Sequence, residues 1–142
     1  MSARAGYPHT ATITTRWKDN DVYGHVNNVE YYSFFDTVIN AWLIREGGLD
    51  IHRGDVIGLC AESHCTFKAA MEFPEAVVAG LRVGHLGNRS VRYEIGLFRE
   101  TSEELIAEGW FVHVFVTRED RRPTAIPDGI RACLARLEVP SS

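Results

Sequence analysis

One long stretch of the chain, from about Val26 to Glu46, has the hydrophobic pattern of a helix. Apolar side chains recur there at spacings of three and four residues, which places them on one helical face. Further apolar residues on neighbouring faces indicate that this helix is buried on more than one side. We expect Gly47 and Gly48 to end it, because glycine adopts the left-handed C-terminal conformation at little cost. The side chains predicted to face inward are Val29, Tyr32, Phe35, Val38, Ile39, Trp42 and Leu43, with Tyr31, Phe34 and Ile44 on the neighbouring faces.

The remaining patterns predict strands and one short helix. Residues 10–17 are rich in β-branched side chains and predict a first strand. From Val56 to Thr117, apolar and polar residues alternate in four runs, which are separated by hairpin-like breaks. Residues 128–137 have the pattern of a short amphipathic helix. The four alternating runs are centred on 57–67, 77–83, 91–97 and 106–116, and the inward side chains of the last helix are Ile130, Cys133, Leu134 and Leu137.

The order of these elements is a strand, a long helix, four meandering strands and a terminal helix. It predicts an α+β fold in which a curled antiparallel sheet wraps around the one long central helix. The chain has no internal repeat, low-complexity tract or linker, so we expect one domain over residues 1–142. Such a sheet has exposed edges, and an exposed edge strand invites pairing with a second copy. We therefore expect a homodimer with a continuous sheet.

The composition argues against several classes of function. The net charge is −4 and acids and bases are mixed along the chain, unlike the basic face of a nucleic-acid-binding protein. No stretch is long enough to span a bilayer, and residues 1–12 lack the pattern of a signal peptide. The three cysteines have no disulfide-framework spacing and indicate reduced thiols. We expect a cytoplasmic protein that binds neither nucleic acid nor membrane, although a local basic cluster could still hold a nucleotide-tailed ligand.

The segment from Arg16 to Tyr31 carries the candidate chemistry. It places two carboxylates, Asp19 and Asp21, in a turn just before the long helix. The first turn of a helix presents unpaired N–H groups with a partial positive charge, which can hold a developing oxyanion. A carboxylate beside such donors is the smallest set of groups that can catalyse the transfer of an acyl group to water. Aspartate before a helix is also a common N-cap, and the residues alone leave both interpretations open.

This segment resembles the signature of the 4-hydroxybenzoyl-CoA thioesterase-like branch of the hotdog superfamily. That signature is a strand ending in an aromatic residue, the string Asp-x-Asp-x-x-Gly-His-Val-Asn-Asn or a related form, and a long helix. The resemblance extends over nearly the whole chain and includes an Arg-Ser pair after a glycine turn, here Arg89 and Ser90. It implies the hotdog fold and assembly as a homodimer or as a tetramer of two dimers. The matching residues are Trp17, Asp19, Asp21, Gly24, His25, Val26, Asn27, Asn28 and Tyr31.

The resemblance implies hydrolysis of an acyl-CoA or acyl-carrier-protein thioester to a free acid and a thiol. Asp21 either attacks the thioester carbon or activates the water that does so. The backbone N–H of Asn28 polarises the thioester carbonyl, and His25 and Asn27 orient Asp21 or the water. Some relatives carry Tyr or His at the position of Asn28 and Tyr at that of Trp17, so the groups supporting Asp21 differ here.

Coenzyme A carries phosphates, which arginine can bind through two oxygens at once. Arg89, in its glycine turn, is the first candidate for this contact, and Lys68 is a second. Tyr31 is expected to line the acyl pocket. Arg82 and Arg92 are further basic candidates, although for any one of these four charges a solvated surface group is the more common explanation.

Two other functions stay open at the level of sequence. One is a hotdog dehydratase or hydratase, which uses a His with a Glu or Asp across the interface. The other is a non-hydrolytic module that binds acyl thioesters, and thiol release distinguishes it from an enzyme. Cys60, His64 and Cys65 do not have the paired spacing of a zinc site, so we expect neither a metal nor a cofactor.

Overall fold

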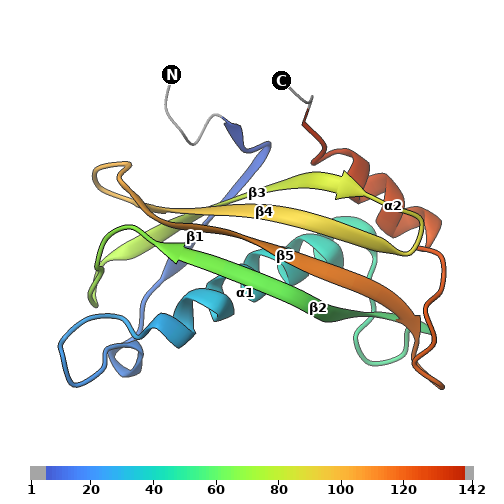
Figure 1. The fold of residues 1–142 in the computed structure, drawn as a ribbon, viewed down its shortest axis with the longest axis horizontal. Helices are drawn as coiled ribbons and strands as arrows, with labels where there is room; N and C mark the ends of the chain where they lie inside the picture. The colour runs from blue at the N-terminus through green and yellow to red at the C-terminus, as the bar shows by residue number, and fades with distance from the viewer. Residues whose placement is uncertain (1–5, 140–142) are drawn as a thin grey trace.

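A computed structural model describes residues 6–139. Its five strands form one antiparallel sheet that curls around α1, and α2 packs against α1 (Figure 1). The predicted α+β architecture, with one long helix and a short C-terminal helix, is therefore confirmed. The elements are β1 (His9–Thr14), the 3-10 helix η2 (Trp17–Asp19), α1 (Asn28–Gly47), β2 (Val56–Phe67), β3 (Ala76–Leu86), β4 (Ser90–Arg99), β5 (Leu105–Thr117) and α2 (Asp128–Ala135).

The strand order β1-β3-β4-β5-β2 differs from the predicted meander of four consecutive strands. Only β3, β4 and β5 follow one another as neighbours; β2 pairs with the far side of β5, and β1 pairs with β3. Alternation within a run predicts a strand but does not encode which strand lies beside it. The predicted position of β2, next to β3, was therefore wrong. The first strand also ends at Thr14, earlier than predicted, and Trp17 lies in η2.

Helix α1 begins at Asn28, two residues later than predicted, because the side chain of Asn27 caps it. The Asn27 side chain accepts a hydrogen bond from the Val29 N–H at 3.0 Å. The helix ends as predicted at the glycine pair, where Gly48 has a φ of 69°. The buried face carries Tyr31 and Phe34 instead of Val29 and Tyr32, which are exposed. When a helix is apolar on several faces, its pattern does not show which face is buried. The prediction that Val29 and Tyr32 face inward was therefore wrong.

The core lies between α1 and the concave face of β3, β4 and β5. Burial of large apolar side chains there contributes about 1.5–3 kcal/mol for each, and it fixes the start of α1 against the sheet. Helix α2 ends two residues earlier than predicted, and its predicted inward residues Ile130, Cys133 and Leu134 are buried. Leu137 is also buried, just beyond the helix. Within residues 6–139, no helix combines the length and the apolar character that a membrane span needs. The largest fully buried side chains include Phe35, Ile39, Leu43, Leu81, Tyr93, Ile95, Leu97 and Phe115.

Strand β2 differs from the other long strands because most of its side chains are exposed. Of its residues only Cys65 is buried, and a bulge between Cys60 and Glu62 interrupts the predicted alternation. One edge of β2 pairs with β5, and its other edge has no strand partner among the described residues. The sheet therefore ends at β2 in a long strand with unsatisfied backbone groups.

Candidate active site

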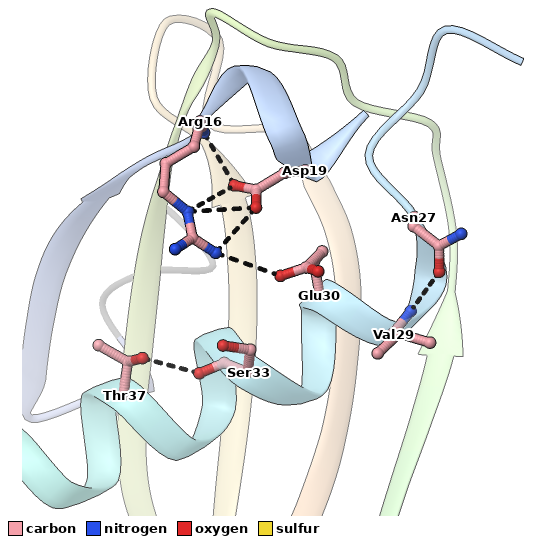
Figure 2. Close-up of polar contacts among 7 residues, drawn as sticks. All are labelled: Arg16, Asp19, Asn27, Val29, Glu30, Ser33 and Thr37. Atoms are coloured by element: carbon pink, nitrogen blue, oxygen red, sulfur yellow. Dashed lines mark hydrogen bonds and ion pairs between the residues drawn. The ribbon is translucent and has the colours of Figure 1, made fainter. Parts of the chain in front are cut away.

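The two aspartates of the turn before α1 have different environments. Asp19 is only 1% exposed and accepts hydrogen bonds from the backbone N–H and the guanidinium of Arg16, at 2.8 and 2.9 Å (Figure 2). Arg16 also contacts Glu30 in the first turn of α1 at 3.5 Å. Burial alone would raise the pKa of Asp19, but the hydrogen bonds from Arg16 lower it below its ordinary value. Asp19 therefore anchors the turn to the helix.

Asp21 lies in a tight turn that follows this anchor. The Asp21 N–H donates to the His25 carbonyl at 2.9 Å, and Gly24 supplies the φ of 82° that this turn requires. One carboxylate oxygen of Asp21 accepts from the Tyr23 N–H at 2.9 Å, and the other accepts from Nδ2 of Asn27 at 3.3 Å. The N-cap of α1 is Asn27, so the capping interpretation of Asp21 is wrong.

Most of the predicted site residues meet in one open pocket of about 410 Å³. Asp21, His25 and Asn28 come from the turn and the start of α1, and they lie opposite the segment that follows β2. Asn27 contacts the pocket through its hydrogen bond to Asp21. The full lining is Asp21, Tyr23, His25, Val26, Asn28, Tyr31, Phe67, Lys68, Ala69 and Ala70.

The backbone N–H groups at the start of α1 differ in whether they have an acceptor. The N–H of Asn27 donates to the Asp19 carbonyl at 2.9 Å, and the N–H of Val29 donates to the Asn27 side chain. The N–H of Asn28 has no hydrogen-bond acceptor within residues 6–139. It is the first residue of a 20-residue helix, where the helix dipole favours negative charge. Among the N–H groups of Asn27, Asn28 and Val29, only that of Asn28 is available to an oxyanion.

The remaining predicted residues differ in how they relate to this pocket. Tyr31 is 3% exposed and packs between Phe34 and Phe67, with ring centroids 6.1 and 5.1 Å away. Lys68 lines the pocket and lies 3.6 Å from Glu108. Arg89 belongs to the turn between β3 and β4, at the end of the sheet opposite to the Asp21 turn (Figure 1). A single copy of the chain therefore does not bring Arg89 to the Asp21 pocket.

Several pocket residues are not predictable from the sequence. Phe67, Ala69 and Ala70 lie at the end of β2 and just beyond it, about 40 positions from the signature, and no local pattern marks them. Tyr23 was inside the signature, but nothing in its spacing showed that its N–H would hold the Asp21 carboxylate. Arg82 and Arg92 are engaged elsewhere, with Arg82 2.7 Å from Glu94 and Arg92 stacked over the Trp110 ring.

Known proteins are similar to this chain in sequence and in fold. The sequence model of the thioesterase-like superfamily matches residues 15–134. The crystal structure of the PA5185 protein from Pseudomonas aeruginosa is 53% identical, with a TM-score of 0.95 over 98% of this chain and 97% of that one. The PA2801 protein from the same organism is 32% identical, with a TM-score of 0.84 over 90% of this chain and 98% of that one. No curated protein matches the sequence.

A more distant structure has the same fold. Slr0204 from Synechocystis, a 1,4-dihydroxy-2-naphthoyl-CoA thioesterase, superposes with a TM-score of 0.81 over 89% of this chain and 94% of that one, at 15% identity. Its likeness concerns the fold, whereas the family match rests on the sequence of most of the chain. The chain therefore belongs to the thioesterase-like superfamily, and its predicted class, a thioester hydrolase with the hotdog fold, is confirmed.

Proposed function

We propose that this protein hydrolyses acyl-CoA thioesters, with Asp21 as the residue that drives the reaction. One observation carries the proposal: Asp21 and Asn28 line the same pocket, and the N–H of Asn28, at the start of α1, has no acceptor within residues 6–139. The donor would bind the thioester oxygen as negative charge develops on it, and the carboxylate would act at the adjacent carbon. Asn27 and the Tyr23 N–H hold the carboxylate in position.

Two routes use the same groups. In the nucleophilic route, an Asp21 oxygen bonds to the thioester carbon, the C–S bond breaks and the thiolate leaves with the electron pair; water then hydrolyses the mixed anhydride. In the general-base route, Asp21 takes a proton from water, whose oxygen attacks the carbon, and the thiolate leaves from the tetrahedral intermediate. Both routes place negative charge on the carbonyl oxygen, where the Asn28 N–H can stabilise it.

Thiol release from a panel of acyl-CoAs tests the proposal. We expect the wild-type protein to release free coenzyme A from at least one class among short-chain, long-chain and aroyl esters, with one acid formed for each thiol. Acyl-CoA binding without thiol release would support the binding-module alternative. Reversible addition of water to an enoyl-CoA, without thiol release, would support the hydratase alternative.

We further propose that a second copy pairs with the open edge of β2. The edge is long and exposed, and an isologous pair would satisfy the backbone groups of both strands. The expected mass in solution is that of a dimer or a tetramer, measured by light scattering. The double substitution Ala61→Lys and Ser63→Lys should lower that mass by repulsion across the two-fold axis, whereas Asp128→Lys on α2 should not. A wild-type mass of one chain would contradict this pairing.

Such a dimer would also bring Arg89 of one copy close to the Asp21 pocket of the other copy. Antiparallel pairing of two β2 strands inverts one sheet end for end relative to the other. The β3–β4 turn of one copy then faces the end of the sheet where the partner's Asp21 turn lies (Figure 1). We propose that Arg89 binds the nucleotide phosphates of an acyl-CoA held by the other copy.

For Arg89→Ala we expect the KM for an acyl-CoA to rise about 10-fold, the size expected for one lost charged hydrogen bond. The KM for the matching acyl-pantetheine should change little, because that substrate lacks the nucleotide. Steady-state thiol release with both substrates measures the difference, and Arg53→Ala, on an exposed loop, is the matched control. An equal rise for both substrates would show that Arg89 does not contact the nucleotide.

A further inference from the structure

The Asp21 turn, residues 21–25, is exposed along most of its length and is held at its base. The four residues that follow Asp21 are all exposed. The two residues that flank the turn, Asn20 and Val26, form a β-bridge with each other, and Val26 is buried. Hydrogen bonds within the turn fix its shape but not its place against the rest of the molecule. The position of Asp21 in the pocket therefore depends on the groups that hold this base.

The buried flank of the turn is bonded to a segment on the other side of the pocket. This segment, residues 69–73, follows β2, and its first two residues line the pocket together with Asp21. The N–H of Val26 donates to the Met71 carbonyl at 2.7 Å. This hydrogen bond joins two backbone groups, so it does not depend on which side chains the two residues carry.

The other flank of the turn is joined to the same segment by the side chain of Asn20. Its Oδ1 accepts a hydrogen bond from the Phe73 N–H at 3.0 Å, and the contact is partly buried. Asn20 lies between Asp19 and Asp21, at the position that the Asp-x-Asp signature leaves open. Alanine at this position would remove the hydrogen bond on this flank and leave the Phe73 N–H without its acceptor.

We propose that Asn20 is a positioning residue, which holds the Asp21 turn at the distance from segment 69–73 at which the Asp21 carboxylate meets the thioester carbon. The inference rests on the proposed function and adds to it a residue that does not touch the substrate. Reacting atoms must lie about 3–3.5 Å apart and be aligned, and a displacement of about 1 Å can slow a reaction about 100-fold. A turn released on one flank would spend less time in the reactive arrangement. The substrate itself loses no contact, so the loss should fall on kcat and not on KM.

Asn20→Ala is expected to lower kcat for the best acyl-CoA of the panel by about 10-fold and to leave KM within about two-fold of the wild type. The matched control is Asn40→Ala. Asn40 is also half-buried and makes a side-chain hydrogen bond, to the Asp36 carbonyl at 2.9 Å, but it lies on α1 away from the Asp21 pocket. The control should keep the wild-type kcat and KM, and circular dichroism checks that both variants are folded at the assay temperature.

Two further measurements separate positioning from a general structural effect. If Asn20 acts through Asp21, Asn20→Ala should lower the residual hydrolysis of Asp21→Asn by less than about two-fold, whereas a general effect would lower it about 10-fold again. The amide of Val26 should exchange its hydrogen about 10-fold faster in Asn20→Ala than in Asn40→Ala, because release of one flank loosens the other.

Several outcomes would overturn the inference: a wild-type kcat in Asn20→Ala, an effect on KM alone, effects that multiply in the double variant, or unchanged exchange at Val26. Each of them leaves hydrolysis by Asp21 intact. Absence of thiol release from every ester, or a rate near that of the wild type in Asp21→Asn, would instead overturn the proposed function and this inference together.

Discussion

Replacing Asp21 with asparagine is expected to lower kcat for thioester hydrolysis by at least ~100-fold, the low end for a positioned acid–base or nucleophilic group. An amide neither attacks a carbonyl carbon nor takes a proton from water at neutral pH. Asparagine can still accept from the Tyr23 N–H, so the turn should keep its shape. Single-turnover thiol release measures the chemical step directly, and circular dichroism with thermal unfolding checks that the fold is retained.

Asp128→Asn is the matched control for this prediction. Asp128 is an exposed carboxylate in the first turn of α2, outside the Asp21 pocket. It undergoes the same change in charge and should keep wild-type turnover. If Asp21→Asn hydrolyses its best substrate at a rate near that of the wild type, Asp21 has no part in the mechanism.

Acidification is expected to destabilise the protein through His113, by about 3 kcal/mol between pH 6.5 and 4. His113 is 3% exposed among Tyr93, Phe111 and Phe115, and burial lowers its pKa to about 4. In the unfolded chain a histidine titrates near pH 6.5. Within this window the unfolded chain binds a proton that the folded chain does not bind. The free energy of unfolding therefore falls as the pH falls, and this contribution is fully present above pH 6.5.

Denaturant unfolding from pH 7.5 to pH 4.5 measures this slope. His113→Gln cannot titrate, and its amide can still pair with the Tyr93 hydroxyl. We expect this variant to have a visibly flatter pH dependence than the wild type, while His52→Gln, on an exposed loop, keeps the wild-type slope. Equal slopes for wild type and His113→Gln would show that another group controls the acid sensitivity.

The parts of the fold that the sequence predicted well depend on local physics. Glycine at the end of α1, the amphipathic face of α2 and the alternating runs of β3, β4 and β5 each follow from backbone or packing rules within a short segment. The prediction of which residues of α1 face inward was wrong at Val29 and Tyr32. Apolar side chains surround this helix, and only the packing of the sheet decides which face is buried.

The candidate site was predictable where residues are close in sequence, and unpredictable where the fold brings distant segments together. Asp21, Asn27 and Asn28 are separated by a few positions, and their pocket follows from a turn before a helix. Phe67, Ala69 and Ala70 join this pocket only because the fold places the end of β2 beside the start of α1, which the sequence does not encode locally. The anchoring role of Asp19 depends on its burial beneath Arg16, which is likewise visible only in three dimensions.

The central claim is that the carboxylate of Asp21 hydrolyses the thioester that this pocket binds. Its most direct test measures acyl-CoA binding by calorimetry and thiol release in parallel samples of wild type and Asp21→Asn. We predict that both proteins bind the ester with similar affinity and that only the wild type releases thiol at an appreciable rate. Equal release by both proteins, or binding without release by the wild type, would contradict the claim.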